Sequence, residues 1–310
     1  WTGDFPAPSR ILQDRLEQAL SCPVAAHGRH IPARWGPVHR QLAYLERALS
    51  LLRHRRAYRG FFCVQQFIGL YACWLAEALR ISLPPVFLQP LIYVPRRGIF
   101  GWFWRRFFTR ALSHPALRLA FCHSRGELDV YRREFPAAAA KFRHLQFTIE
   151  PLAPPKEPAD PPYLFSAGTS CRDYATLFRA AALLPPQAPP LRVACKAADI
   201  RGLAVPSNVH PEHGLWQQAY RNVLAQSSLV IVPLQPLPVS AGQLVFLQAM
   251  SAGRPIVATR TPTSCEFLDD TCAWLVPPED PQALATAIEE AMAHPEIARQ
   301  KAAAARARFQ

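Results

Sequence analysis

The chain has 310 residues, more than one hydrophobic core usually serves, so we expect two domains of about 150 residues each. Half of the residues are apolar and 18% are charged, which excludes the disordered, collagen-like and coiled-coil classes. The formal net charge of +13 lies entirely in residues 1–150, which carry 22 basic and 9 acidic side chains. Residues 151–310 carry 13 of each, so the first half is the part expected to meet an anionic surface or ligand.

In the first half, short apolar runs alternate with longer segments of helical periodicity, as in a parallel sheet with crossover helices. The predicted strands are residues 24–27, 60–65, 85–90, 117–123 and 145–149. The predicted helices are residues 11–20, 37–53, 67–79, 98–112 and 125–135, the last opening on a capping-box pattern of Ser124 and Glu127. Because the chain opens without methionine, on residues typical of a strand end, we expect the first strand to be truncated.

Residues 150–162 contain six prolines and no apolar periodicity, which predicts a domain linker. The expected organisation is a first domain at 1–150, a linker at 151–162 and a second domain at 163–310. The second domain alternates again, with strands at 163–167, 191–195, 229–233 and 255–259, and helices at 173–184, 215–226, 242–252 and from 281 onward. Two Rossmann-like α/β domains with mainly parallel sheets would face each other across a cleft, with ligands at the carboxyl ends of the strands.

The eight cysteines show no C-x-x-C pair and no metal-ligand spacing with the histidines, so no metal site is predicted. Several lie in apolar runs, which favours buried, reduced thiols and a cytosolic setting. No uninterrupted apolar run reaches the length of a membrane span, and no signal peptide is recognised. We therefore expect a cytoplasmic protein, at most peripheral at the inner face of the membrane.

Five motifs follow one another in the second half: YLFSAG at 163–168 with RDY at 172–174, NV at 208–209 with Gly214, LVIVP at 229–233, residues 240–259, and residues 273–284. In order and spacing they resemble the donor domain of GT-B fold glycosyltransferases, especially family 4 (group 1). The first half resembles the matching acceptor domain through Cys122, His123, Ser124 and Glu127. The resemblance implies transfer of a sugar from a nucleotide-diphosphate-sugar to a glycan, lipid-linked or cell-envelope acceptor. It also implies a retaining, metal-independent reaction with no cofactor besides the nucleotide-sugar co-substrate.

Several residue types at the predicted donor site suit a diphosphate. Gly168 ends a strand and lets the backbone approach a ligand closely, and Arg172 can place a delocalised cation on a diphosphate. Ser240, Gly242 and Gln243 open a helix, whose free N–H groups form an anion-binding arrangement. The alternative for Arg172 is an arginine at a helix start that pairs with Asp173 or with solvent.

Three further donor-site residues are less specific. The resemblance implies that Gln248 stands where family 4 places the second glutamate of its E-x7-E motif, which holds the ribose hydroxyls, and that Val209 lies in the segment that reads the nucleobase. Lys196 follows a strand and can reach a phosphate. The alternatives are an ordinary helix residue for Gln248 and a solvated loop lysine for Lys196.

The sequence departs from the family pattern at two places. Ala241 or Gly242 replaces the first glutamate of the motif, and Gln89 stands where many members carry a histidine. We identify no catalytic residue. These departures leave open a non-catalytic GT-B protein that binds a nucleotide or a partner. A sugar-nucleotide epimerase is disfavoured because no set of acid and base carboxylates with a histidine is recognised.

Residues 95–110 combine arginines with bulky aromatics. On a helix, Phe100, Phe103 and Phe107 would share a face with arginines along its edge, a pattern typical of an interfacial membrane contact. The predicted membrane or acceptor contacts are Arg96, Arg97, Trp102, Trp104, Arg105 and Arg106, and a second basic cluster comprises Arg53, Arg55, Arg56 and Arg59. The alternatives are a helix that covers the sheet with core aromatics, and a nucleic-acid binder, which is disfavoured because no recognised motif accompanies the charge.

Overall fold

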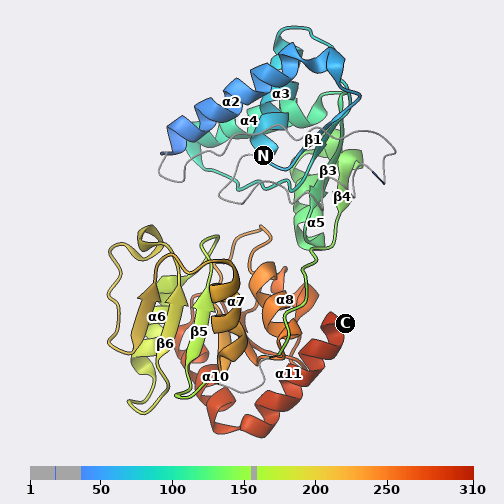
Figure 1. The fold of residues 1–310 in the computed structure, drawn as a ribbon. Helices are drawn as coiled ribbons and strands as arrows, with labels where there is room; N and C mark the ends of the chain where they lie inside the picture. The colour runs from blue at the N-terminus through green and yellow to red at the C-terminus, as the bar shows by residue number, and fades with distance from the viewer. Residues whose placement is uncertain (1–17, 19–35, 155–158) are drawn as a thin grey trace. The chain divides into compact units, whose positions relative to one another are not determined.

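The computed structural model describes Gln18, residues 36–154 and residues 159–310. The chain divides into two compact units, with the boundary between Leu145 and Gln146 (Figure 1). The predicted helix at 11–20 and strand at 24–27 lie outside the described residues, apart from Gln18.

The first unit has a four-stranded parallel sheet in the order β1-β2-β3-β4. Its elements are α2 (Pro37–Arg53), a 3-10 turn η1 (Arg55–Ala57), β1 (Phe61–Cys63), α3 (Gln66–Ala78), β2 (Val86–Leu88), α4 (Gly98–Ser113), β3 (Leu117–Cys122), α5 (Arg125–Glu134), a 3-10 turn η2 (Pro136–Lys141) and β4 (Phe142–His144). The core lies between the sheet and the helices, with Leu88, Phe108 and Phe135 buried in it. This architecture follows the predicted alternation of strands and helices.

Local signals explain where two helices of the first unit begin and end. Ser124 accepts a hydrogen bond from the Glu127 amide at 3.1 Å, and the Glu127 carboxylate accepts one from the His123 amide at 3.2 Å, so the predicted capping pattern opens α5. Lys141 Nζ donates to the carbonyls of Leu112 and His114, 2.8 Å each, where α4 ends. A cation at this end also opposes the negative pole of the helix dipole.

The predicted strand at 145–149 is wrong. The last strand of the first unit is β4, which pairs with β3 through Phe142, Arg143 and His144. Beyond Leu145 the chain leaves this sheet, and Phe147 and Ile149 pack against the core of the second unit. Their apolar character reflects that packing, which the sequence pattern could not distinguish from a strand.

The second unit has a six-stranded parallel sheet in the order β10-β9-β8-β5-β6-β7. Its elements are β5 (Leu164–Ala167), α6 (Tyr174–Leu183), β6 (Leu191–Ala194), a 3-10 turn η3 (Ala197–Ile200), β7 (Val209–Glu212), α7 (Gln217–Gln226), β8 (Leu229–Val232), α8 (Gln243–Ser251), β9 (Ile256–Thr259), α9 (Ser264–Phe267), β10 (Trp274–Val276), α10 (Pro281–Ala293) and α11 (Pro295–Phe309). The sequence analysis did not predict strands β7 and β10. It also did not predict that the last helix is divided into α10 and α11.

Both faces of this sheet are buried. Successive residues of β5 and β8 enter opposite cores: Phe165 and Val230 pack in one, and Leu164 and Ile231 in the other. Helices α7 and α8 contribute to the first core, and α6 and α10 to the second. Such burial on both faces explains the continuous apolar runs of these parallel strands.

The described part of the predicted linker packs on the second unit. Leu152 is buried in its core, and the Leu152 amide donates to Ser251 Oγ at 3.1 Å. Ala159 also packs against this core. Where the structure describes it, the proline-rich segment is therefore bound to the second unit rather than a free tether.

Candidate functional site

The order of the second sheet reverses beside β5. From β5 the chain builds β6 and β7 on one side, then returns to build β8, β9 and β10 on the other. The loops that follow β5 and β8 therefore leave neighbouring strands in different directions, and ligands of open α/β sheets bind at this point. Here the two loops are joined, since the Asp173 amide donates to Pro233 O at 3.2 Å and the Gln235 amide to Cys171 O at 2.9 Å.

Gly168 and Arg172 form one structural element after β5. The Arg172 side chain folds back on the strand end, where Nε donates to Ala167 O at 2.7 Å and Nη1 to Ser170 O at 2.9 Å. Gly168 has a φ of +119°, and a Cβ at this position would lie 2.4 Å from Arg172 Nη2. Glycine is needed here for its backbone conformation and for the space that the guanidinium occupies.

The positive charge of Arg172 has no acidic partner among the described residues. Asp173, the partner in the alternative interpretation, instead caps α6 by accepting a hydrogen bond from the Thr176 amide at 3.0 Å. Burial lowers the pKa of Arg172, and the neighbouring Tyr174 and Tyr220 oppose that shift. A poorly solvated guanidinium that contacts only carbonyl groups favours an anionic ligand.

The loop after β8 ends at the start of α8, which is the second part of the candidate site. Gly242 is the N-cap of α8 with a φ of +88°, and a Cβ there would lie 2.6 Å from the Phe246 ring. No side chain caps this helix end. Gln243 is only 7% exposed, and its buried Nε2 has no hydrogen-bond partner in the described part of the chain. Free backbone N–H groups and an unpaired buried amide donor are what a ligand oxygen would satisfy.

Gln248 has a definite partner. It is 5% exposed on α8, and its Oε1 accepts a hydrogen bond from the Tyr220 hydroxyl on α7 at 3.0 Å. Burial raises the pKa of Tyr220, while the charge of Arg172 lowers it, so Tyr220 lies between the two predicted residues. Tyr174 and Tyr220 were not predicted as site residues, although Tyr174 stands in the RDY motif. The Tyr174 hydroxyl donates to Gly168 O at 2.5 Å.

Two predicted residues stand apart from this group. Lys196 follows β6, the strand beside β5, but it is exposed, and its amide donates to Asp199 Oδ2 at 3.1 Å. Val209 is the first residue of β7, pairs with Leu191 at the start of β6 and is buried in the core. Because it lies at the amino edge of the sheet, Val209 is removed from the candidate site. The residues of this segment that reach the carboxyl edge are those that follow Glu212.

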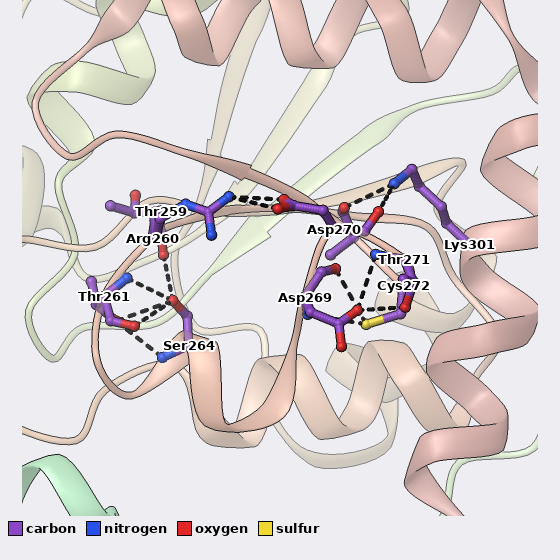
Figure 2. A network of polar contacts seen from close by, with 10 residues as sticks. Thr259, Arg260, Thr261, Ser264, Asp269, Asp270, Thr271, Cys272 and Lys301 are labelled. Atoms are coloured by element: carbon purple, nitrogen blue, oxygen red, sulfur yellow. Dashed lines mark hydrogen bonds and ion pairs between the residues drawn. The ribbon is translucent and has the colours of Figure 1, made fainter.

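A polar network fixes the adjacent loop after β9 (Figure 2). Thr259 Oγ1 accepts a hydrogen bond from the Leu234 amide at 2.9 Å, which connects this loop to the one after β8. Ser264 Oγ donates to Thr259 O at 2.7 Å and accepts from the Thr261 amide at 2.8 Å. Arg260 pairs with Asp270 at 2.8 Å. The loops around the candidate site are therefore held together by buried hydroxyl groups and by backbone hydrogen bonds.

In the first unit, α4 has one buried and one exposed face. Trp104, Phe107 and Phe108 pack on the core, and Arg96 lies over the Trp104 ring at 4.3 Å. Phe100 and Phe103 are 79% and 57% exposed, whereas Phe107 packs on the core, so only the later part of the face that these three residues share is covered. The predicted contact residue Trp104 belongs to the core because the helix turns its ring toward Phe67 and Phe108.

The other predicted contacts are on the surface of the first unit. Arg97, Trp102, Arg105 and Arg106 are exposed along α4 and at its start. The second basic cluster lies at the end of α2 and in η1, before β1 begins.

The described residues offer neither a metal centre nor a membrane span. They include no group of three or more histidine, cysteine, aspartate or glutamate side chains placed to hold a metal ion. None of the helices in this part of the chain combines the length and the hydropathy that crossing a membrane requires.

Two Rossmann-like units, the second with a strand order that reverses beside β5, are the architecture of the GT-B class of glycosyltransferase folds. The Anabaena protein Alr3699/HepE, crystallised in complex with UDP-glucose, is 15% identical and has a TM-score of 0.69, with 96% of this chain and 83% of that chain covered. Sucrose-phosphate synthase of Thermosynechococcus elongatus is 18% identical, also with a TM-score of 0.69, with 93% and 80% covered. The lipopolysaccharide outer core galactosyltransferase WaaB is 14% identical with a TM-score of 0.55, covering 88% and 76%. The predicted GT-B fold is confirmed.

The sequence itself gives the more particular result. Residues 192–294 match the family described as glycosyl transferases group 1. The predicted resemblance to group 1 is confirmed there. No curated protein sequence matches the chain.

Proposed function

We propose that the protein transfers a sugar from a nucleoside diphosphate sugar, bound at the carboxyl edge of the second sheet, to a glycan, lipid-linked or cell-envelope acceptor. The observation that carries this proposal is the Arg172 guanidinium, half-buried against Gly168 without an acidic partner in the described chain. A diphosphate would supply the missing negative charge.

The comparisons support the class of substrate. The solved structure of Alr3699/HepE contains UDP-glucose, so a uridine nucleotide is the first donor to test. WaaB, by its name, adds galactose to the outer core of lipopolysaccharide, which supports a cell-envelope acceptor. The matching family over residues 192–294 supports glycosyl transfer as the reaction.

The proposed chemistry uses fixed positive groups. Arg172 and the N-terminus of α8, with Gly242 and Gln243, would bind the diphosphate and stabilise the charge that develops on it as the sugar leaves. Such groups can replace a metal ion, so we propose a metal-independent reaction that needs no cofactor. We also propose retention of configuration, in which the leaving phosphate takes the acceptor proton and no protein base is required.

The acceptor would be presented at a membrane. The exposed face of α4 carries arginines and large apolar side chains, which suits an anionic lipid surface. We propose that the protein works as a peripheral protein at the cytosolic face of that membrane.

A thermal-shift screen of nucleoside diphosphates and their sugars with the whole chain tests the donor site. We expect one nucleotide family to raise the Tm, and the corresponding nucleotide-sugar to release nucleoside diphosphate slowly without acceptor. The absence of a Tm shift with any nucleotide would contradict the proposal. A Tm shift without nucleotide release would instead favour a binding protein, consistent with the loss of both motif glutamates and with the Gln248–Tyr220 hydrogen bond.

A further inference from the structure

The first unit has an open groove of about 410 Å³ between α4 and the corner where α5 meets η2. Phe135 and Ala138 line its apolar side. Helix α4 forms the opposite wall. This wall begins at Trp102 and continues with polar side chains, those of Arg105, Arg106, Thr109, Arg110 and Ser113. Three guanidinium groups on one wall make this an anion-binding surface.

Two of the three arginines have acidic partners, whereas the third does not. Arg105 lies 3.5 Å from the Glu134 carboxylate, and Arg110 lies 3.1 Å from that of Glu77. Arg106 lies over the Trp102 ring at 5.5 Å, and no hydrogen bond or ion pair joins it to a residue that the structure describes. A guanidinium stacked on an indole keeps the N–H groups along its edge free to donate. Arg106 is therefore the cation that a ligand in the groove would meet.

The groove continues into an apolar surface at the start of α4. Ile99, Phe100, Trp102 and Phe103 are all exposed there. Trp102 belongs to both surfaces, and its ring also contacts that of Phe103 at 4.9 Å. Large apolar side chains beside the unpaired Arg106, with the Trp102 indole between them, match the layers of a lipid headgroup and its acyl chains.

We propose that this groove binds the phosphate group of an anionic membrane lipid. Arg106 would donate to the phosphate oxygens while the four apolar side chains enter the boundary of the acyl chains. The excess of arginine over the single groove carboxylate, Glu134, favours a lipid with net negative charge. The inference rests on the proposed function only in that the acceptor is presented at the membrane, and its test requires no sugar.

The test is flotation of the whole chain with phosphatidylcholine vesicles that contain or lack phosphatidylglycerol. We expect binding only to the anionic vesicles, and Arg106→Gln should weaken it about fivefold or more. Arg53→Gln removes the same charge from the other basic cluster and should float as the wild type does. Equal weakening by both variants, or equal binding to both vesicles, would overturn the proposal.

Arg106→Lys separates a phosphate site from general attraction. Lysine keeps the charge but cannot stack on Trp102 and present two parallel donors, so it should bind almost as weakly as the glutamine variant. Wild-type flotation of Arg106→Lys would show that only the charge matters and would overturn the site. The Tm of each variant without ligand confirms that it folds, and the Tm shift with nucleotide tests the donor proposal separately.

Discussion

Arg172 illustrates how a single half-buried charge can mark a candidate site. Its guanidinium lies against the end of β5 because Gly168 leaves room for it, and its hydrogen bonds go to carbonyl groups. A carboxylate beside it would have neutralised the charge within the protein. Because Asp173 is used to cap α6, the charge remains available to a diphosphate.

Gly168→Ala tests this arrangement. The added methyl group would displace the guanidinium, and the positive φ would strain the backbone by about 1–2 kcal/mol. We expect a lower Tm and at least tenfold weaker nucleotide affinity, measured by calorimetry. Gly253→Ala has a similar strain at φ +63° but no close contact, so it should lower the Tm alone. Wild-type affinity in Gly168→Ala would contradict this account.

In contrast to Gly168→Ala, the variant Gln243→Leu should not lower the stability of the free protein. The unpaired Nε2 of Gln243 costs the free protein about 1–3 kcal/mol, and leucine removes that cost at similar volume. We expect an unchanged or higher Tm for the free protein, together with the loss of most of the Tm shift caused by nucleotide. Gln226→Leu, an exposed change on α7, should retain that shift. A full shift in Gln243→Leu would show that the amide does not serve the ligand.

For single residues, the sequence predicts a role correctly where that role depends on local backbone geometry. Gly168 and Gly242 were recognisable because a strand end and a helix start impose their conformations. Tyr174 and Tyr220 were not, since their roles arise from contacts made only after folding. The Tyr220 hydroxyl reaches Gln248, which lies 28 positions away in the sequence. Val209 was expected at the candidate site because the motif identifies this segment of the chain. The motif does not show in which direction the strand runs, and Val209 lies at its start.

The helices and strands also divide into features that the local sequence predicts and features that depend on contacts made after folding. The predicted limits of α4 nearly match the observed helix, but the sequence could not decide how much of its aromatic surface is covered, because apolar residues occur all around its first turns. Strand β7 reads VHPE and lacks the apolar run expected of a strand, whereas β10 reads WLV and is apolar but only three residues long. Both became strands because they extend an existing sheet from β6 and β9.

The network between the loop after β9 and α11 predicts a pH dependence. Hydrogen bonds from Thr271, together with the charge of Arg308, lower the pKa of Asp269 from 3.8 to about 2. Because the folded value is the lower one, this carboxylate stabilises the fold above pH 4 and loses that effect as the pH falls toward 2. Measured as Tm against pH, Asp269→Asn should therefore lose less stability over this range than the wild type.

Glu289→Gln is the matched control for this experiment. Glu289 is an exposed residue of α10, and its replacement should leave the wild-type slope unchanged. Parallel curves for the wild type and Asp269→Asn would show that the network around Asp269 does not contribute.

For the whole molecule, alternation of strands and helices was sufficient to predict two parallel α/β units. Composition also showed that the excess positive charge lies in the first half, and arginines of that half line the α4 groove. The exact limits of the units were harder to predict, because proline content marks an irregular segment but not the surface on which it packs. Leu152 shows this, since it lies in a proline-rich run and is nevertheless buried.

Calorimetric titration of UDP into the whole chain tests the central claim most directly. Arg172→Gln removes the half-buried cation at the end of β5, whereas Arg179→Gln removes the same charge from an exposed position of α6. The account predicts saturable binding by the wild type and by Arg179→Gln, and binding at least tenfold weaker by Arg172→Gln. Equal affinity in Arg172→Gln and the wild type would contradict it.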